Sequence, residues 1–125
     1  MKVSLEPLIR EGHSITPKVE DRRLFVKLAG TFDMTAATAL QIYLDQAQRE
    51  ARKEQVLELV IDISDVCYLG SSCLKSFVTL TVSLQRGAAG MLLRILINPR
   101  LDWQQRAFLV LARAAPNRVV VAPIA

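Results

Sequence analysis

The sequence predicts a single α/β domain in which helices pack against a mostly parallel β-sheet. Short apolar runs typical of buried strands, at residues 24–29, 56–63, 91–97 and 118–122, alternate with stretches of helical apolar spacing. The 125 residues, 51% hydrophobic and 22% charged, suit one globular core and are too few for two. Right-handed crossovers would join roughly four or five strands and three to five helices into one domain, residues 1–125, with its core at about 15–122.

The N-terminal part, residues 3–17, alternates weakly and contains two prolines and a glycine. Proline is tolerated at sheet edges but not in central strands, so we expect an irregular lead-in in which one short edge strand can form. The strand at 24–29 follows a charged turn, and residues 15–19 are placed to pair with it as a hairpin.

A helix is predicted for residues 34–53. Asp33 or Thr35 can cap it, because a short side-chain oxygen accepts hydrogen bonds from the N–H groups of the first turn. The basic residues at its end suit the negative pole of the helix dipole. Apolar residues at three- and four-residue spacing form its buried stripe: Ala37, Leu40, Tyr43, Leu44, Ala47 and Ala51.

The stretch that organises the chain is a strand at 56–63, a loop and a helix. Val60 and Ile61 side by side indicate burial on both faces of the strand, as when helices cover both sides of a sheet. A polar loop should follow the strand and tighten at Gly70. A loop between a strand end and a helix N-terminus is where α/β domains usually place their functional site.

The helix predicted at 71–86 carries two apolar stripes. One consists of Leu74, Phe77, Val78 and Thr81, and the other of Cys73, Leu80 and Leu84. A single helix on a sheet needs only one buried stripe. Part of the second is therefore either exposed to a partner or buried against a neighbouring helix, and the sequence favours neither.

The C-terminal part predicts a strand at 91–97, a helix and a last strand at 118–122. Asn98 and Pro99 end the first strand, and Asp102 can cap the helix. One side of this helix is expected to consist of Trp103, Arg106, Ala107, Val110, Leu111 and Ala114.

Charge and cysteine content indicate an ordinary cytoplasmic protein. The net charge of +4 is spread along the chain, which is typical of a solubilising surface and does not favour nucleic acid as a partner. Two cysteines imply no disulfide framework, and a reducing compartment suits them. No signal peptide and no apolar run long enough to enter a bilayer is visible, so we expect a cytoplasmic location without membrane insertion.

Enzyme chemistry is poorly supported. The single histidine, His13, lies in the lead-in and is expected to be a solvated surface residue. Asp62 and Asp65 could form a carboxylate pair, but we expect them to bond local backbone N–H groups instead. Cys67 precedes a loop and a helix as in thiol phosphatases, but no arginine follows to hold phosphate, which favours a buried structural cysteine. We therefore predict no enzyme, no cofactor and no metal site.

The serine pair Ser71 and Ser72 has two interpretations. One hydroxyl can cap the helix, contributing on the order of 1 kcal/mol. Alternatively, a hydroxyl at a helix N-terminus is a suitable phosphorylation site, because the helix dipole tolerates the added charge. The two interpretations are compatible.

Two segments resemble the STAS domain, the fold of bacterial anti-sigma factor antagonists and of the cytoplasmic tails of sulfate transporters. LAGTFDMT at 28–35 is similar to the family segment L-x-G-x-(L/F)-D-x-x between the first strand and the first helix. VIDISDVCYLGSSCL at 60–74 is similar to the family stretch V-x-D-x-S-x-V-x-x-(M/I)-D-(S/T)-(S/T/A)-G-L. The resemblance covers roughly residues 15–122 and agrees with the predicted order of elements.

The resemblance implies a non-enzymatic partner switch in transcription regulation. The unphosphorylated antagonist binds an anti-sigma factor that is also a serine kinase, and phosphate on the first motif hydroxyl breaks that complex. That hydroxyl falls on Ser71. The partner-binding residues that the resemblance implies are Asp33, Gly70, Ser71, Ser72, Cys73 and Leu74.

The chain departs from the family pattern at two of these positions. Gly70 stands where the family has aspartate, and Cys73 stands where it has glycine. The cysteine would place a side chain where the helix approaches a partner. Two other functions stay open: a non-phosphorylated accessory subunit of an ABC-type membrane transport assembly, and a module binding phosphate or nucleotide at the Ser71 helix. The sequence does not indicate an oligomeric state.

Overall fold

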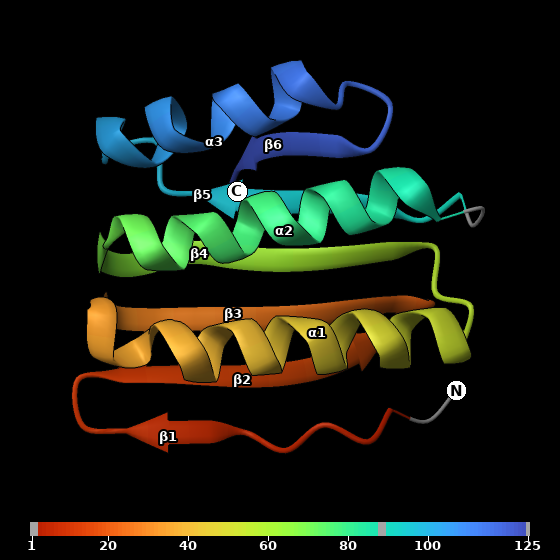
Figure 1. Ribbon diagram of the computed structural model, residues 1–125, viewed down its shortest axis with the longest axis horizontal. Coiled ribbons are helices and arrows are strands. Elements are labelled where there is room, and N and C mark those ends of the chain that lie inside the picture. Colours follow the sequence, from red (N-terminus) through yellow and green to blue (C-terminus); the bar gives the residue numbers. More distant parts are fainter. Residues whose placement is uncertain (1–2, 88–89, 125) are drawn as a thin grey trace.

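The computed structural model describes residues 3–87 and 90–124, which form a two-layer α/β structure (Figure 1). Within these residues, one sheet has the order β1-β2-β3-β4-β5-β6, and α1, α2 and α3 all cover the same face of it. The elements are β1 (Leu8–Arg10), β2 (His13–Glu20), β3 (Arg23–Phe32), a 3₁₀ turn η1 (Met34–Ala36), α1 (Ala37–Lys53), β4 (Glu58–Leu69), α2 (Ser71–Arg86), β5 (Leu92–Ile97), α3 (Asp102–Ala114) and β6 (Val119–Pro123).

The predicted fold class, α/β with a mostly parallel sheet, is confirmed. Strands β3 to β6 pair in parallel, whereas β1 and β2 are antiparallel to their neighbours. The described residues contain six strands rather than the predicted four or five. The number is higher because both the short edge strand β1 and the hairpin of β2 with β3 form. A two-residue turn, Asp21 and Arg22, closes this hairpin with φ of 52° and 61°, as the strand twist prefers.

Strand β4 is longer than the sequence indicated. It continues through the stretch predicted as a polar loop and ends only at Leu69, so the prediction that the strand ends at residue 63 was wrong. The polar residues stay in the strand because β3 remains paired alongside it, with register irregularities after Lys27 and Gly30. The Asp62 carboxylate accepts hydrogen bonds from the N–H of Ser64 at 2.9 Å and from its hydroxyl at 2.6 Å, as expected for local backbone bonding.

Helices α1 and α2 lie side by side over the centre of the sheet (Figure 1). The α1 stripe is confirmed except at its first residue, Ala37, which is only half-buried. In α2 the second stripe, Cys73, Leu80 and Leu84, is buried. Helix α2 is therefore packed against its neighbours. It exposes Val78, which was predicted in the first stripe, at 42%, and Val82, which lies in neither stripe, at 39%.

The buried face of α3 differs from the prediction. Gln104, Phe108 and Leu111 are buried, whereas Arg106 and Val110 are exposed. Phe108 meets Phe77 of α2 edge to face, with ring centroids 5.0 Å apart, which fixes the rotation of the helix.

The start of α3 also differs. The helix begins at Asp102, and Leu101 occupies the cap position without a side-chain hydrogen bond, so the cap predicted at Asp102 is absent.

Candidate functional site

The candidate site is the junction of β4 and α2, at the carboxyl ends of the parallel strands (Figure 1, left side). Gly70 alone connects the two elements. Its N–H donates to the carbonyl of Phe32, the last residue of β3, at 2.8 Å, and its carbonyl accepts from Cys73 and Leu74 in the first turn of α2. The end of β3 and the start of α2 are thereby held together.

The segment after β3 adds a capped turn to this junction. The Asp33 carboxylate accepts from the N–H of Thr35 at 3.0 Å and from its hydroxyl at 2.6 Å, so the predicted cap is present, but it caps η1 rather than α1. These hydrogen bonds, chiefly the one from the Thr35 hydroxyl, lower the pKa of Asp33. Asp33 therefore carries a fixed negative charge at the surface beside α2.

Cys73 is fully buried and points toward this turn. Its Sγ lies 3.4 Å from the backbone oxygen of Asp33, and burial, aided by the nearby Asp33 charge, raises the pKa of the thiol. The expectation that this cysteine would lie where α2 meets a partner was wrong. It joins α2 to η1 from inside, because the third position of the helix faces the core.

Ser71 and Ser72 form the first turn of α2, and both are exposed. The cap residue is Gly70, and no side-chain hydrogen bond caps the helix, so the capping role considered for the serines is not observed. Their hydroxyls lie at the positive pole of a helix dipole, on the solvent side. Leu74, one turn on, is half-buried against the core.

Two exposed apolar side chains flank this junction that sequence reasoning missed. Met34 in η1 is 80% exposed, and Tyr68 near the end of β4 is 54% exposed. Both side chains are open to a contact near the exposed first turn of α2. The sequence offered one signal for them. Met34 and Tyr68 lie in the two segments that resemble the STAS family, and neither belongs to an apolar stripe that would bury it.

Gln104 of α3 holds in place the part of β4 that precedes the site. It is fully buried, and its side-chain amide donates to the carbonyls of Ile63 at 2.8 Å and Val66 at 3.1 Å. Its oxygen accepts from the N–H of Asn98 at 2.7 Å. This one side chain therefore ties α3 to the irregular part of β4 that leads to Ser71.

The carboxylates of β4 do not form a reactive pair. The Asp62 carboxylate is occupied by Ser64, and Asp65 forms an ion pair with Lys27 at 3.0 Å. No group of three or more potential metal ligands occurs in the described part of the chain. None of its helices is long and apolar enough to cross a membrane.

Two further sequence expectations were wrong. His13 is half-buried rather than solvated, because its ring packs on Phe32 with centroids 5.1 Å apart. Cys67 is exposed rather than buried, because it falls on a strand position that points away from the core.

No protein-family model matches the sequence, and no curated protein matches it significantly. Solved structures do match it. An anti-sigma factor antagonist from Mycobacterium paratuberculosis superimposes with a TM-score of 0.65 at 20% identity, over 90% of this chain and 88% of that one.

Two more distant structures agree. The Bacillus cell fate determinant SpoIIAA in its phosphorylated form matches with a TM-score of 0.58 at 15% identity, over 86% of this chain and 90% of that one. A Shewanella loihica protein described as having a SpoIIAA-like fold matches with a TM-score of 0.53 at 18% identity, over 88% and 84% of the two chains. The chain thus has the SpoIIAA-like fold, the fold in which anti-sigma factor antagonists are built.

Proposed function

We propose that this protein is a non-enzymatic partner-switching module that binds an anti-sigma factor with serine-kinase activity through the surface around Ser71. The observation that carries this proposal is the exposed first turn of α2, whose hydroxyls cap nothing, on a SpoIIAA-like fold. Asp33, Gly70, Ser71 and Ser72 supply the polar part of that surface. Met34 and Tyr68 supply exposed apolar contacts beside it.

Phosphorylation of Ser71 would switch this surface. A phosphate adds about two negative charges, which the N-terminus of α2 tolerates and which the fold need not rearrange to accommodate. The same charge falls in the centre of the contact surface, next to the fixed charge of Asp33. Binding is lost because the partner would have to desolvate these charges together.

The experiment is a binding titration with a serine-kinase anti-sigma factor from the same organism. Ser71→Ala should keep binding, whereas Ser71→Asp should weaken it at least tenfold. Gln46→Glu, which adds the same charge on the exposed side of α1, is the matched control and should leave binding unchanged. Mass spectrometry after incubation with the kinase and ATP should place phosphate on Ser71, and phosphate on another residue would refute the switch.

A further inference from the structure

A groove follows the outer surface of the helix layer between α1 and α2. Two hollows make it up, of about 290 Å³ near the start of α2 and about 420 Å³ near its end. Thr79 lines both, so they lie next to each other along α2. We call this surface the α1–α2 groove. It begins at Ser72, beside the proposed phosphorylation site, and ends at Arg86.

The walls of the α1–α2 groove combine apolar and basic side chains. Ile42 lines the first hollow and is 53% exposed, and Val78 and Val82 line the second and are about 40% exposed. Val78 and Val82 are four residues apart on α2 and therefore lie one above the other on the same helix face. Singly exposed apolar residues need no explanation, but three along one groove form a stripe.

The charges along the groove have one sign. Lys75 lines the first hollow, and Arg52 and Arg86 line the second. None of the described residues that line either hollow is acidic. One acidic residue lies beside the first hollow: Asp45 accepts a hydrogen bond from Gln41, which lines that hollow. The groove is therefore most basic toward its Arg86 end.

Part of this basic character has a local structural role. Arg52 donates to the backbone oxygen of Ser83 at 3.1 Å, and basic residues at helix ends favour the dipole. That role does not account for Lys75, which stands in the first half of α2 where the dipole favours the opposite sign, nor for the valines between the charges.

We infer that the α1–α2 groove binds an acidic amphipathic helix of a partner protein. Its apolar face would cover Ile42, Val78 and Val82, and its carboxylates would meet Lys75, Arg52 and Arg86, the helix-in-groove mode of recognition. A second copy of this chain is a poor occupant, because a twofold interface would bring the basic groove against itself. The inference rests on the proposed function in assigning this helix to the same partner.

The test uses the full chain and a synthetic helical peptide with leucine on one face and glutamate flanking it. A second peptide carries lysine in place of glutamate. Fluorescence anisotropy at low salt should show the glutamate peptide binding at least tenfold more tightly than the lysine peptide. Equal binding of the two peptides would overturn the inference. Nuclear magnetic resonance shifts on the unmodified protein should fall at Ile42, Val78 and Val82, and shifts confined to other surfaces would also overturn it.

Charge reversal provides the second arm. The double variant Lys75→Glu with Arg86→Glu should lose at least tenfold in affinity for the glutamate peptide. The matched control, Arg106→Glu with Arg113→Glu, changes the net charge equally on exposed α3 positions and should stay within about twofold. An equal loss in both variants would reduce the effect to overall charge and refute the groove. Circular dichroism establishes that each variant is folded.

Three outcomes separate this inference from others. Sedimentation with phosphatidylserine vesicles, abolished by the groove variant while the glutamate peptide fails to bind, would assign the groove to membranes and overturn it. Phosphorylation of Ser71 without binding of the glutamate peptide would remove this inference and leave the proposed function standing. Peptide binding without phosphorylation of Ser71 would leave this inference standing and remove the proposed switch at Ser71.

Discussion

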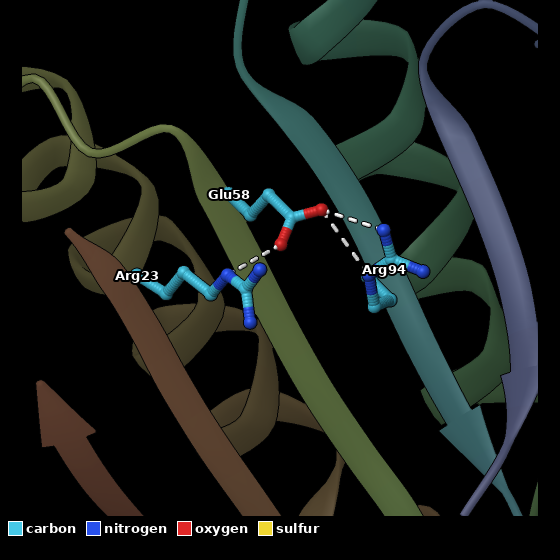
Figure 2. A network of polar contacts seen from close by, with 3 residues as sticks. All are labelled: Arg23, Glu58 and Arg94. Carbon is cyan, nitrogen blue, oxygen red and sulfur yellow. Dashed lines mark hydrogen bonds and ion pairs between the residues drawn. The ribbon is translucent and has the colours of Figure 1, made fainter. Parts of the chain in front are cut away.

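The two faces of the sheet differ in how they meet solvent: helices cover one, and the other is open. The face under the helices is a continuous apolar core contributed by alternating residues of every central strand. The other face carries no helix in the described structure, and several of its charged side chains form ion pairs, among them those of Arg23, Glu58 and Arg94 (Figure 2). Glu58 lies between two arginines: its Oε1 accepts from Arg94 at 2.7 and 3.1 Å, and its Oε2 lies 2.8 Å from Arg23 Nε.

This difference explains a prediction that was correct for the wrong reason. Val60 and Ile61 are both buried, as the sequence indicated, but only Ile61 belongs to the apolar core beneath the helices. Val60 lies in the sheet between Phe25 and Arg94 on the neighbouring strands, and their large side chains shield it. Burial on both faces of a strand therefore does not require a second helix layer.

The largest expected effect lies on the helix face. Phe108→Ala should lower the free energy of unfolding by about 3–5 kcal/mol, because it leaves a cavity beside Phe77 that the packed core cannot close. Urea denaturation followed by circular dichroism measures this. Val110→Ala, at an exposed position of the same helix, should cost under about 0.5 kcal/mol. Similar costs for both would contradict the buried face assigned to α3.

The next effect concerns the one polar side chain buried between α3 and β4. Gln104→Leu keeps the approximate volume but leaves the carbonyls of Ile63 and Val66 and the N–H of Asn98 without this partner. We expect a loss of about 2–4 kcal/mol. Gln105→Leu is the neighbouring exposed control. A neutral Gln104→Leu would show that water or backbone movement replaces all three hydrogen bonds.

The open face should respond less. Glu58→Gln removes the charge shared by two arginines, but both arginine side chains reach solvent, at 50% and 33% exposure, and can rehydrate. We expect a loss of about 1 kcal/mol that shrinks in high salt. Glu20→Gln, in the exposed ion pair with Lys18, should have a smaller effect. A loss above that of Gln104→Leu would reverse the ranking of the two faces.

The smallest expected effect is at the ion pair of Lys27 with Asp65. Lys27→Met should change stability by under about 0.5 kcal/mol, because both side chains are about half exposed or more. The hydrogen bond to Asp65 raises the pKa of Lys27, so its contribution is full below pH 10.5 and is lost as the pH rises through the raised value. Unfolding of both proteins at pH 8 and at pH 11 should therefore differ less at pH 11. A difference that grows with pH would contradict this pairing.

The fold was predictable where apolar spacing is unambiguous. The α1 stripe and the order of elements follow from periodicity and from turn residues. The face of α3 was not predictable, because a fully buried glutamine contradicts the polar pattern until its three hydrogen bonds are known. The extent of β4 was missed because its polar residues satisfy themselves locally within a strand held by β3.

The candidate site shows the same division. Asp33 and the Ser71 turn lie close together, because they follow the ends of adjacent parallel strands. Whether Cys73 points outward or inward is decided by the rotation of α2 over η1, which no local pattern specifies.

Gly70 has a consequence for how such proteins can diverge. Its backbone angles, φ −71° and ψ 163°, are open to any residue, and a Cβ there would meet Phe32 and Tyr68 atoms no closer than 3.5 Å. Aspartate is a favoured cap residue and would fit. The charge beside Ser71 can therefore change without remodelling the fold. Under the proposed function, a substitution at this position would change the charge that a partner meets without a change of fold, which is one way to separate one partner from another.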